Sequence, residues 1–206
     1  MANYYPVHPV NPQQRSLNQV VTLLRDGGLI AYPTDSGYAF GARLGNREAI
    51  ERIRRIRRLT EKHHFTLVLS EFAQVGQYVQ MDNWMFRAIK SAVPGRYTFI
   101  LKATRDVPRV MLHQKKHTVG IRVPDHVTAL ALMDALGEPI VSSTLILPDE
   151  EQPMTDGWQV KETLDAEVDA VLDSGDCGAE PTTVVDFTSG EPVITRTGAG
   201  DPTPFQ

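Results

Sequence analysis

Segments with the periodicity of amphipathic helices alternate with short β-branched runs along nearly the whole chain, and this alternation limits the fold more than any other feature. The first unit shows the pattern. A helical segment capped by Asn11, with Pro12 at its first position, ends at Gly27-Gly28 and is followed at once by an apolar strand from Leu29 to Tyr32. Apolar residues resume at Tyr38 and Phe40, which predicts a second strand after the turn. Repeated units of this kind favour an α/β or α+β fold in which helices flank one sheet.

The same patterns predict the other elements. Further helices are expected at residues 47–58 (capped by Asn46), 71–79, 82–92, 105–113, 125–136 (capped by Asp125) and 155–167, and further strands at 65–69, 97–102, 118–123, 139–143, 168–172, 183–188 and 192–196. Ser189-Gly190 separates the last two strands as a tight turn, which predicts a hairpin and hence a mixed sheet. No linker or repeat interrupts the pattern, so we expect a single domain over residues 1–206, with the acidic C-terminal part 149–206 included.

The composition is that of a soluble globular protein, with 41% hydrophobic and 22% charged residues. No apolar run approaches the roughly 20 residues that span a bilayer, and the chain does not open with a basic segment followed by an apolar one. We therefore expect neither secretion nor membrane insertion. The single cysteine, Cys177, can form no internal disulfide, which fits a cytoplasmic location.

The net charge of −4 hides a segregation of charge along the chain. Residues 43–122 hold 17 of the 21 Lys and Arg but only 6 of the 25 Asp and Glu, so that 4 basic and 19 acidic residues lie elsewhere. Two interpretations stay open. The two blocks neutralise each other across the fold, or the basic block forms a surface that meets phosphate groups.

Much of this positive charge lies in the segment ERIRRIRRLTEKHHF, residues 51–65. On a helical wheel its isoleucines share the buried face, while most of its arginines point away. Arg57 instead falls at the margin of the buried stripe, where a guanidinium needs an anionic partner or a solvent-filled cavity. Either the helix frays there and Arg57 extends over the rim, or Arg55 and Arg57 project into a pocket that holds an anion.

Polar side chains follow four of the expected strands, at Thr34-Asp35-Ser36, Arg122, Ser142-Ser143-Thr144 and Thr182-Thr183. Either they converge on one site, since ligands of open α/β sheets bind outside strand ends, or each stabilises its own turn. Other signals are missing. There is no phosphate-binding loop and no nucleophile elbow, and the spacing of His113 and His117 does not favour zinc, so no protein metal ligands are expected.

The motifs AYPTDSGYAFG, R-x-R before an apolar strand, PGRYTFILK, VGIRVPDH, PIVSSTLILP and PTTVVDFTSGEPVITRTGAG follow one another along nearly the whole chain. This succession resembles the YrdC/YciO family, and the stretches NPQQR and IRRLTEKHHFTLVL resemble its YciO branch. The resemblance implies a twisted, open, mixed sheet flanked by helices, with a basic concave cavity associated with binding of nucleotides and double-stranded RNA. It also implies a reaction in which L-threonine, bicarbonate and ATP form threonylcarbamoyl-AMP and pyrophosphate, toward threonylcarbamoyladenosine in tRNA, with Mg²⁺ accompanying ATP.

The resemblance also implies site residues. The expected catalytic residues are Arg55, Arg57 and Arg122, and the expected contacts to substrate or nucleotide are Tyr32, Thr34, Asp35, Ser36, Lys62, Thr98, Ser142, Thr144, Thr182 and Arg196. The turn from Thr34 to Gly37 would form a wall of the cavity, with Gly37 letting the backbone approach the ligand. One motif departs from the family: the serine of S-x-N is Thr144 and its asparagine is Ile146, whose side chain can form no hydrogen bond.

Three hypotheses of function follow. The chain is a nucleotide-binding enzyme with weak or altered threonylcarbamoyl-AMP synthase activity, or a non-catalytic module that binds double-stranded RNA or tRNA. In the third hypothesis, the basic block merely meets the acidic segment or a partner subunit. Nothing in the sequence indicates an oligomeric state.

Overall fold

The computed structural model describes residues 1–60, 63–112 and 116–206. Its strands are β1 (Asn3–Pro6), β2 (Leu29–Thr34), β3 (Gly37–Arg43), β4 (Thr66–Val68), β5 (Val79–Gln80), β6 (Tyr97–Ala103), β7 (Thr118–Arg122), β8 (Ile140–Thr144), β9 (Ala170–Asp173), β10 (Thr183–Asp186) and β11 (Val193–Arg196). Its helices are α1 (Gln14–Arg25), α2 (Arg47–Arg57), α3 (Val75–Tyr78), α4 (Asn83–Ala92), α5 (Val127–Leu136) and α6 (Gly157–Leu164), with 3₁₀ turns at Phe72–Gln74, Arg109–Met111 and Thr203–Phe205.

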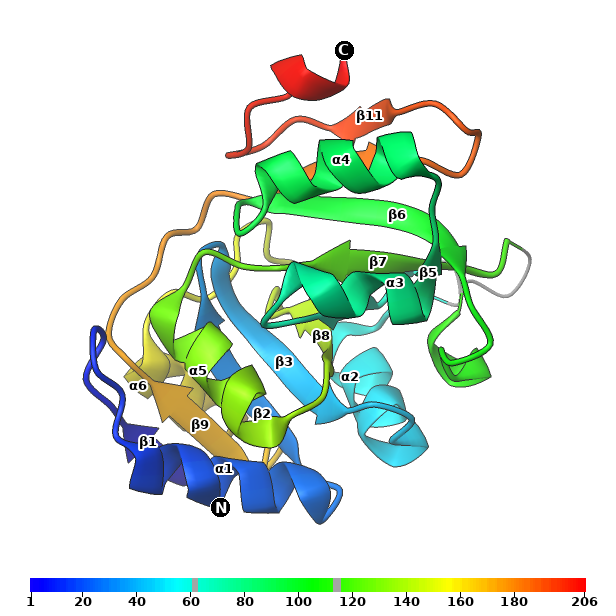
Figure 1. Ribbon diagram of the computed structural model, residues 1–206. Coiled ribbons are helices and arrows are strands. Elements are labelled where there is room, and N and C mark those ends of the chain that lie inside the picture. The colour runs from blue at the N-terminus through cyan, green and yellow to red at the C-terminus, as the bar shows by residue number, and fades with distance from the viewer. Residues whose placement is uncertain (61–62, 113–115) are drawn as a thin grey trace.

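All of these strands join one sheet, in the order β1-β9-β2-β3-β8-β4-β7-β6-β10-β11, with β5 paired to β6 (Figure 1). The sheet is mixed, because β2 pairs with β3 antiparallel and with β9 parallel. The predicted C-terminal hairpin is present as the antiparallel pair of β10 and β11. The expected fold class, a mixed sheet flanked by helices, is therefore confirmed.

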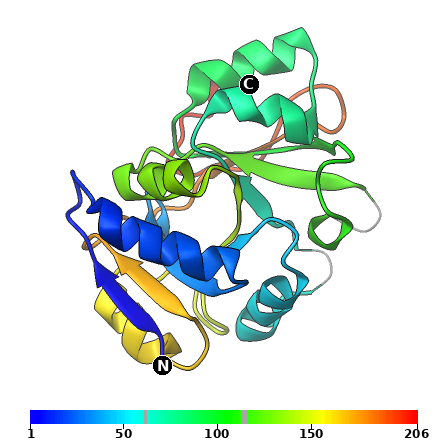
Figure 2. The same cartoon turned by 60° about the horizontal axis from the view of Figure 1, so that its bottom comes forward.

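The two faces of the sheet carry separate apolar cores. Along β2 the side chains alternate, so that Leu29 and Ala31 enter one core while Ile30 and Tyr32 enter the other. Apolar residues of α2, α3, α4 and α6 pack in the first core. Those of α1 and α5 pack in the second, where the two helices lie side by side (Figures 1 and 2).

The helix α2 forms largely as predicted. The side chain of Asn46 accepts a hydrogen bond from the backbone N–H of Ala49 at 3.1 Å and so caps its first turn. The helix ends at Arg57, because Arg58 adopts a left-handed conformation with φ of 50°. The chain therefore turns away immediately after Arg57.

Two predicted caps are wrong. Helix α1 begins at Gln14, since His8 accepts backbone hydrogen bonds from Val10 and Asn11 and holds that segment in a turn. Helix α5 begins at Val127 and is capped by His126. The expected cap, Asp125, instead donates its backbone N–H to the carboxylate of Asp35 at 3.0 Å.

Other boundaries also differ from the prediction. Residues 71–79 form a 3₁₀ turn and then the short α3, and Val79 already belongs to β5. Of the expected helix 105–113, the described residues form only the turn Arg109–Met111, and residue 113 lies outside them. Helix α6 spans Gly157–Leu164 rather than 155–167, because Asp156 caps it. Strand β1 was not expected at all, since its NYYP sequence is short and lacks alternation.

Candidate functional site

A cavity of about 330 Å³ lies on the part of the sheet that α1 and α5 leave uncovered, and we call it the central cavity. It extends across β3, β8, β4, β7, β6, β10 and β11, and residues at and after the end of α2 close one side of it. Its polar lining consists of Arg57, Arg122, Arg196, His63, His64, Thr66, Thr98, Ser142, Ser143, Thr144 and Thr182. No Asp or Glu of the described residues lines it.

Strand alternation explains why polar groups gather on this part of the sheet. Thr98 and Ile100 of β6 face the cavity, while Phe99 between them enters the core on the opposite face. The same parity places Gly120 and Arg122 of β7 in the cavity and Ile121 in the core. Strands β4, β6 and β7 therefore contribute alternate side chains to the cavity, whereas β8 contributes three consecutive residues at its end, Ser142, Ser143 and Thr144.

Arg122 forms a buried ion pair with Asp35 beside the cavity, and both side chains are less than a tenth exposed. Asp35 also accepts a hydrogen bond from the backbone N–H of Asp125, so its buried negative charge has both an ion pair and a further donor. The Nε–H of Arg122, in contrast, is buried with no hydrogen-bond acceptor among the described residues. A buried donor without an acceptor costs about 1–3 kcal/mol, so this atom is suited to an oxygen atom supplied by a ligand.

At one end of the cavity, Arg57 is half-buried and holds two neighbours. Its Nε donates to the carbonyl of Ile146 at 3.1 Å, and its guanidinium donates to the hydroxyl of Ser143 at 2.5 Å. No described carboxylate pairs with it, and burial lowers its pKa to about 10. The group remains a cation at neutral pH. It is thus a positive charge at the cavity that lacks an anionic partner in the described part of the chain.

Arg196 lies at the cavity on the β11 side. It donates to the carbonyl of Thr182 at 2.9 Å and to its hydroxyl at 3.0 Å, and that hydroxyl lies 2.9 Å from the hydroxyl of Thr98. Burial and the nearby charge of Arg122 lower the pKa of Arg196. Two neighbouring cations that disfavour each other's charge would both be stabilised by a bound anion.

The structure brings together seven of the residues predicted from the sequence, namely Arg57, Arg122, Thr98, Ser142, Thr144, Thr182 and Arg196. Tyr32 lies behind the cavity, where its hydroxyl bonds to Ser142 at 2.9 Å. Lys62 lies outside the described residues. Sequence reasoning did not assign His63, His64, Thr66 or Gly120 to the site. A search for small or polar residues at alternate strand positions would have found Thr66 and Gly120.

The turn after β2 is not part of the cavity lining, in contrast to the expectation. The hydroxyl of Thr34 donates to the carbonyl of Gly37 at 2.7 Å and accepts the backbone N–H of Ser36, so the side chain of Thr34 stabilises the turn itself. The hydroxyl of Ser36 lies 3.4 Å from that of Thr34. A Cβ at Gly37 would lie 2.6 Å from Pro153. Gly37, with φ of 91°, is therefore needed for a tight turn and close packing rather than for approach to a ligand.

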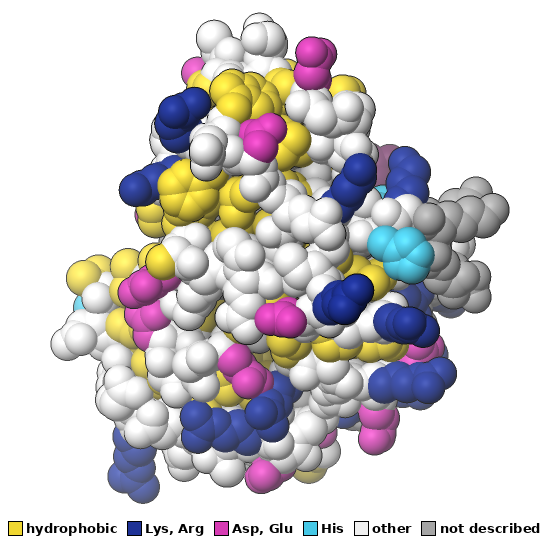
Figure 3. Space-filling model, turned by 45° about the vertical axis from the view of Figure 1, so that its right-hand side comes forward, with side chains coloured by type: hydrophobic (Ala, Val, Ile, Leu, Met, Phe, Trp, Pro, Cys, Tyr) yellow, Lys and Arg dark blue, Asp and Glu magenta, His cyan; other side chains and the backbone are white. Residues whose placement is uncertain are grey.

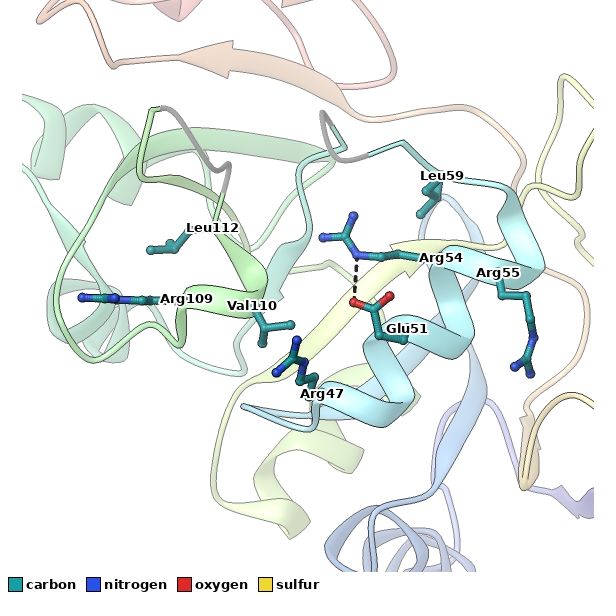
Figure 4. Close-up of a pocket in the computed structure, with 8 residues that line it drawn as sticks. All are labelled: Arg47, Glu51, Arg54, Arg55, Leu59, Arg109, Val110 and Leu112. Carbon is teal, nitrogen blue, oxygen red and sulfur yellow. Dashed lines mark ion pairs between the residues drawn. The ribbon is translucent and has the colours of Figure 1, made fainter.

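Arg55 does not share a cavity with Arg57, although both were expected to project into one pocket. It lines a larger, open hollow of about 690 Å³ beside α2, to which Arg47, Glu51, Arg54 and Arg109 also contribute. Figure 4 shows Arg55 directed away from the ion pair of Arg54 and Glu51. Its side chain is 70% exposed and pairs with Glu167 at 3.5 Å. Two residues along a helix correspond to about 200°, which explains the separation.

The two charge blocks meet across the fold. Six ion pairs join an arginine of residues 43–122 to a carboxylate outside that range, involving Asp35, Glu138, Asp149, Glu167, Asp169 and Glu180. On the face shown in Figure 3, Lys and Arg side chains are interspersed with Asp and Glu. Six of the 17 basic residues of the block are therefore paired with the rest of the chain. At the central cavity, Arg57 of this block and Arg196 outside it have no ion pair with a described residue.

Two further observations concern the described residues. They contain no group of three or more His, Cys, Asp or Glu that is suited to hold a metal ion. No helix among them combines the length and the apolar character needed to cross a membrane.

Comparison with known proteins identifies relatives along the whole chain. The Sua5/YciO/YrdC family model, described as "Telomere recombination", matches residues 22–198. An uncharacterized protein of Haemophilus influenzae is 48% identical over 206 residues, and the YciO protein of Escherichia coli K12, also described as uncharacterized, is 46% identical over 205 residues; both matches cover 100% of both chains.

Solved structures show the same fold. The crystal structure of E. coli YciO superposes with a TM-score of 0.96 at 46% identity and covers 100% of both chains. Sua5 of P. abyssi, solved in complex with L-threonine, has a TM-score of 0.86 at 24% identity over 95% of this chain and 57% of that one. At that identity, the likeness to Sua5 shows the fold alone.

Proposed function

The chain belongs to the Sua5/YciO/YrdC family, and from this premise we propose that its central cavity binds ATP and forms threonylcarbamoyl-AMP from ATP, L-threonine and bicarbonate. The observation that carries the proposal is a cavity with three arginines, two of them without ion pairs to described residues and the third with an unsatisfied buried Nε–H. Guanidinium groups bind phosphate through charge-assisted and often bidentate hydrogen bonds.

The charges suit adenylate formation. When a carboxylate displaces pyrophosphate from ATP, negative charge develops on the α-phosphate and on the leaving pyrophosphate. Fixed cations placed around these groups stabilise the transition state more than the ground state. Arg57 and Arg196, already held by hydrogen bonds to Ser143 and Thr182, can act without reorganisation.

Mg²⁺ would accompany ATP in this proposal. It binds through one or two carboxylates together with substrate phosphates, so it does not need a cluster of protein ligands. The carboxylate of Asp35, which pairs with Arg122 of the cavity lining, is also engaged with the backbone of Asp125. The described residues therefore fit a metal held chiefly by the phosphates of the nucleotide, and the metal would neutralise charge on those phosphates.

The dimensions of the cavity favour a small molecule over RNA. Its volume of about 330 Å³ lies in the range of small-molecule pockets, whereas double-stranded RNA is bound across an extended basic surface. The exposed arginines Arg55 and Arg58 that would serve such a surface pair with Glu167 and Asp149. Sua5 of P. abyssi has been solved with L-threonine, which supports the amino acid as co-substrate.

Ile146 should lower the rate of this reaction. It lines the cavity where the family motif has asparagine, so one preorganised polar contact is missing. The loss of such a contact costs roughly 10²- to 10³-fold in rate. We therefore expect slow turnover relative to family members that keep the asparagine.

The test is the release of pyrophosphate from ATP with L-threonine and bicarbonate present together, or with either omitted. We expect release only with both substrates, and direct detection of threonylcarbamoyl-AMP as product. Arg57→Ala should lower this pyrophosphate release, whereas Arg55→Ala should leave it at the wild-type rate. A rate that neither substrate changes would remove the proposed chemistry. Binding of duplex RNA, with an affinity that falls steeply with salt and is unchanged by Arg57→Ala, would favour the RNA-binding hypothesis instead.

A further inference from the structure

His63 lines the central cavity but is not among the site residues that the family resemblance implies. It follows α2 by six residues, and its backbone N–H bonds to the carbonyl of Thr60 at 3.1 Å. Its ring packs edge-on against Phe65, with ring centres 5.3 Å apart, which fixes the direction of the ring. The Nε2 atom lies 3.1 Å from the hydroxyl of Ser143.

Arg57, Ser143 and His63 form a hydrogen-bonded chain whose direction is set at one end. Arg57 can only donate, so the oxygen of Ser143 accepts from it. The hydroxyl proton of Ser143 is then available to Nε2 of His63, which leaves the ring proton on Nδ1 as a donor. No described residue accepts from Nδ1. If the ring has the other tautomer, the proton of Ser143 is the one available. In either arrangement one neutral donor, either Nδ1–H of His63 or the hydroxyl of Ser143, is left for a ligand.

The neutral donor lies at the end of the cavity where a polar side chain is missing. The carbonyl of Ile146 accepts from Arg57, while the side chain of Ile146 lines the same cavity and can form no hydrogen bond. We propose that His63 is a ligand-binding residue that, together with Ser143, contacts a phosphate group at the Arg57 end of the central cavity. The proposal rests on the proposed function, since it assigns the phosphates of the nucleotide or the released pyrophosphate to this end.

Protonation gives His63 a property that an asparagine would lack. Burial, together with the nearby Arg57, His64 and Arg54, lowers the pKa of His63 to about 4. Among the described residues, these three are the titratable or charged groups that face the ring, since its hydrogen-bond partner Ser143 is uncharged. The free protein therefore holds a neutral ring at pH 7. A bound phosphate favours the protonated ring and raises its pKa, so binding takes up a proton and becomes tighter as pH falls. If the pKa returns to about 6.5 in the complex, protonation of the ring contributes about a tenfold rise in affinity from about pH 7.5 to about pH 5.5, separate from the change that protonation of the ligand itself causes.

The experiment is calorimetric titration with inorganic pyrophosphate between these two pH values, in buffers of different ionisation enthalpy so that proton uptake is measured. His63→Asn keeps a hydrogen-bonding side chain without titration, and it should lose the part of the proton uptake that the ring contributes, while the part that comes from pyrophosphate itself remains. His63→Ala should bind about 2- to 12-fold more weakly at neutral pH, the value of one neutral hydrogen bond. His117→Asn is the matched control, because His117 has a left-handed φ of 52° that asparagine tolerates and lies outside the central cavity.

The outcomes separate this inference from the proposed function. The inference is overturned if the wild-type protein binds no pyrophosphate, or if His63→Asn keeps the wild-type proton uptake while it remains folded by thermal denaturation. If pyrophosphate binds with proton uptake that depends on His63, but ATP is not consumed with L-threonine and bicarbonate, the inference stands and the proposed function fails. If ATP is consumed with L-threonine and bicarbonate but the His63 variants behave as wild type, the proposed function stands and the inference fails.

Discussion

Two arginine-lined hollows flank α2, and they differ in how their charges are compensated. The larger, of about 690 Å³, contains Arg54 paired with Glu51 and Arg55 paired with Glu167. Arg47 and Arg109 also line it, and both are exposed and have no ion pair with a described residue. The central cavity has less than half that volume, and its unpaired arginines, Arg57 and Arg196, are held in place by hydrogen bonds to Ser143 and Thr182. The comparison teaches that volume and arginine content do not identify a phosphate site. A positive charge that has no ion pair and is also held in place by hydrogen bonds is the more useful sign.

The largest expected effect on stability comes from the buried ion pair of Arg122 and Asp35. Because both side chains are almost fully buried, Arg122→Met leaves the carboxylate of Asp35 without its partner. Such a loss costs about 3–5 kcal/mol of the free energy of unfolding. Urea denaturation of the variant measures it. Combining the substitution with Asp35→Leu should recover part of the loss, since the unpaired charge is then removed. A single variant as stable as the wild type would show that this carboxylate is well solvated.

The second contrast compares Arg57 with Arg55. Arg57→Ala removes a charge-assisted donor from the central cavity, and such bonds contribute about 1.5–3 kcal/mol. We therefore expect ATP to bind about 10- to 150-fold more weakly, with little change in the thermal unfolding midpoint. Arg55→Ala is the matched control, because it removes the same side chain from the opposite side of the same helix. Equal affinities in the two variants would contradict the distinction between the hollows.

Much of this arrangement follows from local sequence patterns, and the remainder depends on tertiary contacts. The strands of the sheet centre were predicted because β-branched runs alternate with helical periodicity, and the helical wheel separated Arg57 from the other arginines of its segment. Strand β1 was missed, since a short exposed edge strand carries no alternation.

The site shows the same limit. The pairing of Arg55 with Glu167 joins residues 112 positions apart, and local periodicity contains no information on it. His63 lies in a segment between elements, so no periodic signal indicated that its ring would reach Ser143 on β8. The turn residues Thr34 and Ser36 were placed at the site by motif, although the hydroxyl of Thr34 bonds to the nearby backbone, as short hydroxyl side chains in turns do, and that of Ser36 lies beside it.

The smallest effect is expected for the pair of Arg55 and Glu167, and it tests the other half of the comparison. The atoms lie 3.5 Å apart, with side chains 70% and 44% exposed, so water and salt screen their attraction. Exposed pairs contribute about 0.2–1 kcal/mol, and a double-mutant cycle of Arg55→Ala and Glu167→Gln should give a coupling energy in that range that diminishes at high salt. Glu167→Gln also frees Arg55 from its counterion. If that variant then bound pyrophosphate in the larger hollow, the pairing of its arginines with carboxylates would by itself explain why the two hollows differ. Without such binding, the fixed hydrogen bonds that hold Arg57 and Arg196 are required as well, because an exposed and mobile arginine must lose side-chain entropy before it binds a phosphate.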